Sequence, residues 1–322
     1  MPALEKQVES REPALILSQP LAGLQAQAIG LAERAGLAPM IQPLLARRPW
    51  RWTPAALWPA PLAAVGGIAV TSGTLVLSVG GMGAAVGAAL RRRGCPIVQI
   101  QNPRMRLDRF DLIVANPHDE IAGPNVLISR NALHRISPQR LAAAREAWLP
   151  RFAHLPRPLV AVLVGGANGR YRLDREVAAA LARQLATMMR LDRVGVMLTP
   201  SRRTDASARA AFSQALAPLG AWVWDLQGEN PYVGMLACAD AIVVTTDSVS
   251  MISEAAATAV PVLVAALPGR SRRIGLFVQT MRAAGRVRDF TGRLEHWQTG
   301  PLDDTLAVAQ DMRRRLAMAE LG

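Results

Sequence analysis

Short apolar runs that read as strands alternate with helical runs along almost the whole chain, and this alternation constrains the fold most strongly. Residues 240–264 are the clearest example, because their sequence DAIVVTTDSVSMISEAAATAVPVLV reads as a buried strand, a polar turn, a helix and a second buried strand. Alternating strands and helices form parallel sheets with helices on both faces. The pattern occurs in two successive sets, so we predict an α/β chain of two Rossmann-like, doubly wound domains that face a cleft.

A proline-rich stretch separates the two sets. It covers residues 149–158 and holds three prolines, which is typical of a linker. We therefore predict an N-terminal domain over residues 1–150 and a C-terminal domain over residues 151–302. A last helix within residues 303–322 is expected to pack back across the domains.

The chain carries a formal net charge of +13, and its basic residues are nearly all arginine. This excess favours anionic partners such as phosphorylated ligands or an anionic membrane surface, although arginine codons of a GC-rich genome explain part of it equally well. Aromatic residues make up only 4% of the chain, which leaves few rings for single-stranded bases to stack on. We expect no nucleic-acid partner.

Residues 1–14 are charged and polar, which is unlike a signal peptide. Residues 53–90 carry no charge, but their prolines and glycines favour a proline-rich loop, a buried strand and a small-residue helix over a membrane span. Trp50, Trp52 and Trp58 lie in or beside this region, and tryptophan favours membrane interfaces. We expect a cytoplasmic chain that can contact the inner membrane peripherally.

The two cysteines, Cys95 and Cys238, border apolar segments far apart in the sequence and read as buried free thiols of a reducing compartment. No CxxC pattern occurs and the four histidines are scattered, so we expect no metal site. The GxSxG, GxxxxGK[ST] and HExxH motifs are also absent, which argues against the chemistries that they serve.

Polar loops follow several of the predicted strands, and ligands of open α/β sheets bind beyond the carboxyl ends of strands. The loop GGANGRY, residues 165–171, has glycines that let the backbone approach a phosphate. The loop TPSRRT, residues 199–204, places two guanidinium groups at a helix start, where anions bind. A tight strand–helix turn and a solvated basic loop are the alternatives. The candidate binding residues in these loops are Gly165, Gly166, Asn168, Gly169, Ser201, Arg202, Arg203 and Thr204.

The turn within residues 240–264 is the third such loop. A helix start presents free backbone N–H groups that bind anions, and a carboxylate in the helix can hold ribose hydroxyls. A simple helix cap by Asp247 or Ser248 is the alternative. The candidate residues here are Thr246, Asp247, Ser248, Ser250 and Glu254. Because all three loops fall on one predicted sheet, we expect a nucleotide-sugar or nucleotide as the ligand.

The best acid/base candidates of the first half lie in the loop NPHDE, residues 116–120, which follows a predicted strand. A histidine beside a carboxylate can act as general base toward a hydroxyl acceptor. We predict His118 or Asp119 as the catalytic base, with a structural turn as the alternative.

These motifs carry a family resemblance. The segment VTTDSVSMISEAAATAVPV, together with TPSRRT, GGANGRY, QNPR, NPHDE and the C-terminal residues 301–305, resembles the bacterial members of the mitochondrial-fission (elongated-mitochondria) family over nearly the whole chain. The resemblance implies two-domain, GT-B-like glycosyltransferases whose second domain holds the nucleotide-sugar donor. It also implies that Glu254, which follows the turn that holds Asp247, binds the ribose of the donor, and that Arg202 and Arg203 face the diphosphate.

The first half departs from the family pattern. Its first loop, residues 18–24, keeps Gly23 and, further on, Gln27, but lacks the Lys and the His that the family has there. Our leading hypothesis is a metal-independent, GT-B-like glycosyltransferase that transfers a sugar to an envelope-type acceptor by direct displacement, with the nucleotide-sugar as substrate and no cofactor. A non-catalytic, membrane-associated adaptor that retains the scaffold, like the eukaryotic relatives, is the alternative.

Overall fold

The computed structural model describes residues 11–318, which divide into two compact units. Unit 1 comprises residues 11–129, 133–135 and 304–318, and unit 2 comprises residues 130–132 and 136–303. Most of the polar N-terminal stretch discussed above, residues 1–10, and the end of the predicted last helix, residues 319–322, lie outside the described residues.

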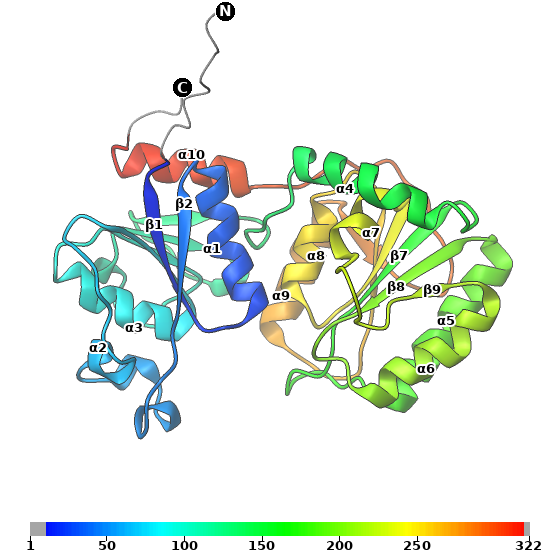
Figure 1. Cartoon of the computed structure of the whole chain (residues 1–322), viewed down its shortest axis with the longest axis horizontal. Coiled ribbons are helices and arrows are strands. Elements are labelled where there is room, and N and C mark those ends of the chain that lie inside the picture. The colour runs from blue at the N-terminus through cyan, green and yellow to red at the C-terminus, as the bar shows by residue number, and fades with distance from the viewer. Residues whose placement is uncertain (1–10, 319–322) are drawn as a thin grey trace, which may run out of the picture. The chain divides into compact units, whose positions relative to one another are not determined.

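Unit 1 is built on a six-stranded parallel sheet in the order β2-β1-β3-β4-β5-β6 (Figure 1). Its strands are β1 (Pro13–Ser18), β2 (Ala38–Pro43), β3 (Leu75–Val79), β4 (Ile97–Ile100), β5 (Leu112–Ala115) and β6 (Val126–Ile128). Helix α1 (Ala22–Arg34) connects β1 to β2, and α3 (Gly80–Arg91) connects β3 to β4. The sheet grows in opposite directions at these two crossovers, so right-handed connections place α1 and α3 on opposite faces.

Unit 2 is built on a second six-stranded parallel sheet, in the order β12-β11-β10-β7-β8-β9 (Figure 1). Its strands are β7 (Leu159–Val164), β8 (Gly195–Pro200), β9 (Trp222–Val223), β10 (Ala241–Thr245), β11 (Val262–Ala265) and β12 (Val287–Asp289). Its helices are α4 (Pro138–Phe152), α5 (Arg175–Asp192), α6 (Ala206–Leu216), α7 (Tyr232–Cys238), α8 (Val249–Ala256) and α9 (Arg272–Ala283). From β7 the sheet grows one way through β8 and β9 and the other way through β10, β11 and β12, which is the order of the dinucleotide-binding fold.

Unbroken apolar runs explain the central strands. The sequences LVAVLV of β7 and AIVVT of β10 are buried along their whole length, as expected for parallel strands covered on both faces. The two strands pair in register, with Val162 opposite Val243. The predicted fold class, two doubly wound, Rossmann-like α/β domains, is confirmed, and the cleft between them stays a prediction.

The proline-rich stretch at residues 149–158 is not a linker. Helix α4 continues through Pro150, and Trp148 and Phe152 are buried in the core of unit 2, with their rings stacked 5.7 Å apart. Phe152 also meets Trp222 edge-on, with ring centroids 5.3 Å apart. This aromatic packing binds α4 to unit 2, so the chain changes units within residues 129–136, before the predicted boundary at residue 150.

The last helix, α10 (Thr305–Arg315), returns to unit 1, where it packs against α1. Val308, Ala309 and Met312 are buried there, and the guanidinium of Arg313 donates to the carbonyl of Ala35 at 2.8 Å. In the uncharged residues 53–90 the predicted buried strand is β3 and the predicted small-residue helix is most of α3, while the predicted proline-rich loop contains short helical turns. Across residues 11–318, no helix combines the length and the apolar character that crossing a membrane requires. Both cysteines are buried free thiols, also as predicted.

Candidate functional site

The predicted binding loops of unit 2 flank the point where its strand order reverses. The sheet changes direction between β7 and β10, and the loops after these neighbouring strands hold residues 165–169 and 246–248. Ligands of doubly wound sheets bind in the crevice at such a switch point, beyond the carboxyl ends of the strands. The loop after β8 follows the next strand on the same edge.

The carboxylate of Asp247 ties these loops together. It accepts the N–H of Gly166 at 2.9 Å, the hydroxyl of Thr245 at 2.7 Å and a guanidinium N–H of Arg203 at 2.9 Å. The Asp247 side chain is 0% exposed. A buried carboxylate needs such partners, because an unpaired one is strongly destabilising. Asp247 therefore points into the protein and positions the three loops, whereas its backbone carbonyl accepts the side-chain N–H of Asn168 at 3.1 Å.

Two glycines allow this close packing. A Cβ on Gly165 would lie 2.2 Å from Asp247 Oδ2, and a Cβ on Gly166 would lie 2.4 Å from the backbone carbonyl of Arg203. Neither distance is possible for real atoms, so both positions require glycine. The glycine-rich loop thus serves the packing of its neighbours, in addition to any approach of a ligand.

The loop after β8 is fixed to the loop after β7 through hydroxyl groups. The hydroxyls of Ser201, at 2.6 Å, and Thr204 both donate to the carbonyl of Gly165. Arg203 adds a bond from Nη1 to the carbonyl of Gly166 at 3.0 Å. Arg202 differs from Arg203, because it is exposed and has no hydrogen-bond or ion-pair partner among the described residues. Of the two predicted arginines, Arg202 is the one left available to an anion.

Helix α8 begins beside this network and is held at both ends. At its start the hydroxyl of Ser248 caps the helix by accepting the N–H of Met251 at 3.3 Å. At its end the guanidinium of Arg286, which is 2% exposed, donates to the carbonyls of Ala256 at 2.9 Å and Thr258 at 2.8 Å. Burial lowers the pKa of Arg286 to about 10. A cation at the C-terminus complements the helix dipole, so Arg286 stabilises α8.

Two further predicted residues stand near the start of α8. Thr246 donates its hydroxyl to the carbonyl of Ala265 at 2.9 Å, which joins the loop after β10 to the end of β11. Ser250 is half-buried in the first turn of α8. Thr246 is therefore a link between neighbouring strands, while the structure gives Ser250 no such role.

Glu254 is half-buried on α8 and pairs with the first residue of α7. The hydroxyl of Tyr232 donates to Glu254 Oε2 at 2.5 Å. Burial raises the pKa of Glu254 from 4.5 to about 7, and the hydrogen bond from Tyr232 opposes this shift. Burial together with the neighbouring carboxyl raises the pKa of Tyr232 well above its ordinary value. Glu254 thus changes charge near neutral pH, a property that often marks functional sites.

We did not predict the loop after β11, which pairs with the loop after β7. Tyr171 forms an antiparallel bridge with Gly269, and the N–H of Arg172 donates to the carbonyl of Pro268 at 2.9 Å. The pairing brings a further set of arginines to the carboxyl edge of the sheet. They are Arg270, Arg272 and Arg273.

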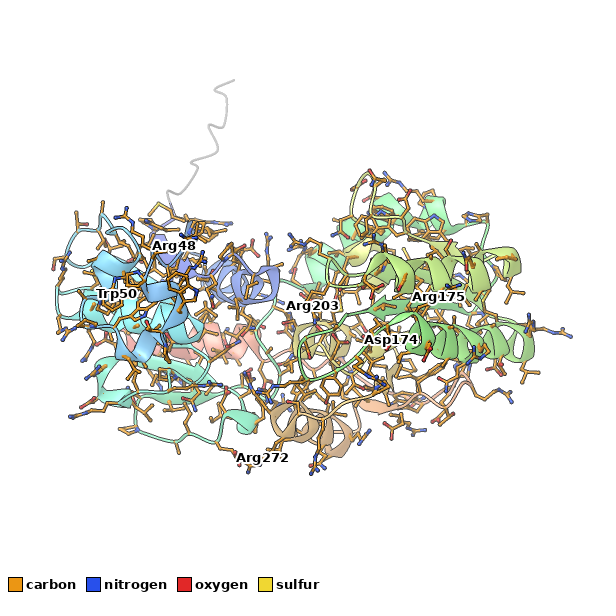
Figure 2. All side chains as sticks on the ribbon, turned by 90° about the horizontal axis from the view of Figure 1, so that it is seen from below. Arg48, Trp50, Asp174, Arg175, Arg203 and Arg272 are labelled. Carbon is orange, nitrogen blue, oxygen red and sulfur yellow. The ribbon has the colours of Figure 1, made fainter. Side chains whose placement is uncertain are left out.

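A repeat in the sequence could have pointed to this loop. The tripeptide Ser-Arg-Arg occurs at residues 201–203 and again at 271–273, each time just before or within the first turn of a helix. In the second copy the hydroxyl of Ser271 caps α9 by accepting the N–H of Ile274 at 3.4 Å. Figure 2 labels Arg203 and Arg272, one from each copy.

The predicted catalytic base lies in unit 1, in a short turn after β5. Asp119 accepts the N–H of Asn116 at 3.1 Å and so closes a capping box, while Asn116 donates its side-chain N–H to the carbonyl of Ser129 at 2.7 Å. His118 is 5% exposed. The two residues are neighbours in this turn, but the carboxylate of Asp119 already has a structural partner, which supports the turn that we held as the alternative.

Unit 1 also contains a buried polar network that we did not predict. Ser78 on β3 donates to Gln99 Oε1 on β4 at 2.7 Å, and both side chains are fully buried. Beyond the end of β4, Gln101 donates to Gln27 on α1 at 3.3 Å. The signal was present in the sequence, since Ser78 and Gln99 are the polar residues of the otherwise apolar runs LVLSV and IVQI. These groups lie toward the carboxyl edge of the sheet, where open α/β sheets bind ligands.

The structure thus brings most of the predicted binding residues of unit 2 into one connected group. Its members are Gly165, Gly166, Asn168, Ser201, Arg203, Thr204 and Asp247. Gly169 lies in the same loop as Asn168, and Ser248 follows Asp247 directly. Glu254 stands apart from this group, because its carboxyl pairs with Tyr232. The ligand-binding roles of all these residues remain predictions.

Comparison with known proteins gives relatives over most of the chain. Residues 22–316 match the family described as "Mitochondrial fission ELM1". The mitochondrial fission protein ELM1 of Arabidopsis thaliana is 35% identical over 248 residues, which is 69% of this chain and 58% of that protein. An uncharacterized protein of Rickettsia prowazekii (strain Madrid E) is 25% identical over 253 residues, which is 66% of this chain and 71% of that protein. The chain therefore spans little more than half the length of the Arabidopsis relative.

Solved structures show the same fold at low sequence identity. A UDP-GlcNAc 2-epimerase from Methanocaldococcus jannaschii, solved with UDP-GlcNAc and UDP, has a TM-score of 0.55 and 12% identity, and the match covers 95% of this chain and 99% of that chain. A UDP-glucosyltransferase from Polygonum tinctorium has a TM-score of 0.52 and 11% identity, with 95% and 90% covered. The MurG of Acinetobacter baumannii has a TM-score of 0.50 and 12% identity, also with 95% and 90% covered. The two-domain fold is that of GT-B glycosyltransferases and related epimerases.

Proposed function

We propose that this chain, which belongs to the mitochondrial fission ELM1 family, binds a nucleotide-sugar at the carboxyl edge of the sheet of unit 2. The observation that carries the proposal is the network around Asp247. It locks the loops after β7, β8 and β10 together at the topological switch point, where doubly wound sheets bind their ligands. The UDP-sugar named with the structural neighbour from M. jannaschii is in keeping with this ligand class.

The proposal gives the residues two kinds of role. Asp247, Arg203 and Thr204 position the loops, because their polar atoms already pair within the protein. Arg202 and those N–H groups of the first turn of α8 that Ser248 does not cap bind the diphosphate, since a guanidinium and a helix N-terminus both attract anions. Glu254 accepts hydrogen bonds from the ribose hydroxyls in its ionised form.

We extend the proposal to transfer of the sugar to a hydroxyl acceptor by direct displacement. In that reaction the developing negative charge on the leaving diphosphate is stabilised by Arg202 and the amides of α8, in place of a metal. The candidate bases are His118 and Asp119 in the turn after β5, where Asp119 also accepts the N–H of Asn116. A cytoplasmic location with peripheral membrane contact is part of the same proposal.

A non-catalytic adaptor is the second candidate function. It is favoured by the name of the Arabidopsis relative, a mitochondrial fission protein. The loop after β1 also lacks the Lys and the His expected there, and Asp119 is held in a capping box. An adaptor would keep the nucleotide-binding edge of unit 2 but would show no transfer.

Calorimetry on the full chain with UDP, GDP, ADP and CMP sugars tests the binding proposal. Removing Arg202 by Arg202→Gln should lower the affinity about tenfold, since a charge-assisted hydrogen bond to phosphate is lost. Arg190→Gln is the matched control, because Arg190 lies in the last turn of α5, at the opposite edge of the sheet. Absence of binding to every nucleotide, or equal loss in both variants, would overturn the proposal. Binding of a nucleotide-sugar without transfer of its sugar to any acceptor, and so without release of the nucleotide, would favour the adaptor.

A further inference from the structure

Residues 44–67, which leave β2 and lead toward β3, expose large apolar side chains. Leu45, Trp52 and Leu57 are 65%, 65% and 74% exposed. Nine large hydrophobic side chains of the described residues are exposed, and five of them lie between residues 40 and 57. We call residues 44–67 the Trp52 segment. It is the blue stretch below the sheet of unit 1 in Figure 1, and Figure 2 looks onto it at the labels Arg48 and Trp50.

Buried residues of the same segment hold it against unit 1. Leu44 and Trp58 are 2% and 6% exposed, and the indole N–H of Trp58 donates to Thr53 Oγ1 at 3.0 Å. The short 3₁₀ helix at Ala55–Leu57 packs against α3. The segment therefore has an inner side fixed by Trp58 and an outer side that presents Trp52 and Leu57, so the exposed side chains are displayed by an anchored backbone.

All the charged residues of the Trp52 segment are basic. It contains Arg47, Arg48 and Arg51 and no acidic residue, and no Asp or Glu occurs anywhere from residue 35 to residue 107. The guanidinium groups of Arg48 and Arg51 lie over the ring of Trp52, 5.8 Å and 4.5 Å from its centroid. The exposed indole and the positive charge are thus presented together.

We propose that the Trp52 segment docks onto an anionic lipid surface. Trp52 and Leu57 would enter the boundary between headgroups and acyl chains, where tryptophan is favoured, and Arg48 and Arg51 would pair with lipid phosphates. A lipid surface fits better than a protein partner, because a headgroup layer supplies the apolar boundary and the negative charge at one depth. A basic side chain with an apolar stem can also keep its charge at that depth while its stem is buried.

The Trp52 segment begins at the edge of the sheet of unit 1 where the predicted catalytic base also lies. The Trp52 segment follows β2 and so leaves the parallel sheet at its carboxyl edge. The loops after β3 and β5, which hold Gly80 and His118, lie on that same edge. Docking would therefore turn this edge, which holds the predicted catalytic base, toward the membrane. The docking itself does not depend on nucleotide binding by unit 2.

Co-sedimentation of the full chain with phosphatidylcholine vesicles, with and without phosphatidylglycerol, tests the proposal. We expect binding only to the anionic vesicles and weaker binding at high salt. Arg48→Gln with Arg51→Gln should lower the partition coefficient roughly 25-fold, at about fivefold for each arginine. Trp52→Ala should lower it about tenfold, as expected for an apolar side chain that leaves the boundary region.

A matched control separates docking from general charge and hydrophobicity. Arg190→Gln with Leu191→Ala removes an exposed arginine and a 60% exposed leucine from α5 of unit 2, and should leave the partition coefficient unchanged. Quenching of tryptophan fluorescence by brominated lipid should decrease in Trp52→Phe, which keeps the apolar contact. Calorimetry with the nucleotide should be unaffected by every variant of the segment.

Three results would overturn the proposal. The first is binding that does not distinguish neutral from anionic vesicles. The second is a control variant that loses as much binding as the segment variants. The third is a dimer that depends on Trp52 in the absence of lipid, since this would assign the exposed side chains to a contact between copies of the chain.

Discussion

Glu254→Gln should stabilise unit 2 at alkaline pH and have little effect at acidic pH. Burial raises the pKa of Glu254 from 4.5 to about 7 in the folded protein. The folded state therefore keeps a proton that the unfolded chain releases between these two values. Stability falls with rising pH wherever the folded state binds more protons. The carboxyl of Glu254 therefore does not destabilise the folded state below pH 4.5, and its destabilising effect is complete above about pH 7.

The size of the effect follows from the shift. Each unit of pKa difference corresponds to about 1.4 kcal/mol, so ionising Glu254 costs the folded state about 3 kcal/mol once the pH exceeds about 7. Glutamine keeps a carbonyl oxygen that can accept the hydroxyl of Tyr232 but carries no charge. The variant should thus be about 3 kcal/mol more stable than the natural protein at about pH 8, and similar to it at about pH 4.5.

Urea unfolding of both proteins across this pH range measures the difference, read on the transition that belongs to unit 2. In the difference between the two proteins, the contributions of all other titrating groups to the free energy of unfolding cancel. Glu229→Gln is the control, because the side chain of Glu229 is 61% exposed in its contact with Arg151 and should change stability by less than about 0.5 kcal/mol at any pH. A stability difference that is the same at acidic and alkaline pH, or that favours the natural protein at alkaline pH, would refute the reasoning.

Three further predictions concern the support of the site. Asp247→Ala should destabilise unit 2 by about 3–5 kcal/mol in urea unfolding, because it leaves the Arg203 guanidinium and two other donors without their buried acceptor. Gly165→Ala should cost about 1–3 kcal/mol in the same assay, because its Cβ would lie 2.2 Å from Asp247 Oδ2; an unchanged midpoint would contradict the close packing. Arg286→Met should lower the unfolding free energy by about 3 kcal/mol, since the carbonyls at the end of α8 lose their donor, and an unchanged unfolding free energy would show that water replaces it.

The alternation of apolar strands and helices was sufficient to predict the two sheets. The strand LVAVLV is wholly apolar and AIVVT is apolar up to its last residue, Thr245, so neither has an alternating polar face for solvent and both fit the centre of a parallel sheet. The polar loops after them were predicted for the same reason, because their glycines, arginines and hydroxyls fall where each strand ends.

The unit boundary could not be read from composition. Three prolines near residue 150 look like a linker, but Trp148 and Phe152 on either side of Pro150 are large enough to bind the helix to unit 2. Local propensity signals a break there, and long-range aromatic packing overrides it. The resulting transfer of α4 to unit 2 depends on contacts with Trp222, about seventy residues away in the sequence.

The sequence also could not show which charged side chains point into the protein and which are exposed. Asp247 and Arg202 are both polar residues at helix starts, yet Asp247 is buried among donors while Arg202 is exposed, with no partner among the described residues. Which of them faces inward depends on glycines that lie in another loop, at residues 165 and 166. The arginines after β11 were missed because their loop contains neither a glycine-rich run nor a carboxylate, and only the repeated Ser-Arg-Arg tripeptide marks it.

The loops after β7, β8, β10 and β11 of unit 2 contain charges of both signs, but their aspartates pair within the protein. Asp174 accepts the N–H of Val177 at 2.9 Å and Asp205 that of Ala208 at 2.8 Å, each as a helix cap, and Asp247 is buried. The N–H of Ala208 lowers the pKa of Asp205, so this cap stays ionised. The same loops carry five arginines: Arg170, Arg172, Arg202, Arg203 and Arg270. Arg203 forms an ion pair with the buried Asp247, and the remaining arginines outnumber the two capping carboxylates. The aspartates thus stabilise the loops themselves, and the arginines leave an excess of positive charge at the carboxyl edge. The proposed binding of a diphosphate requires such an excess.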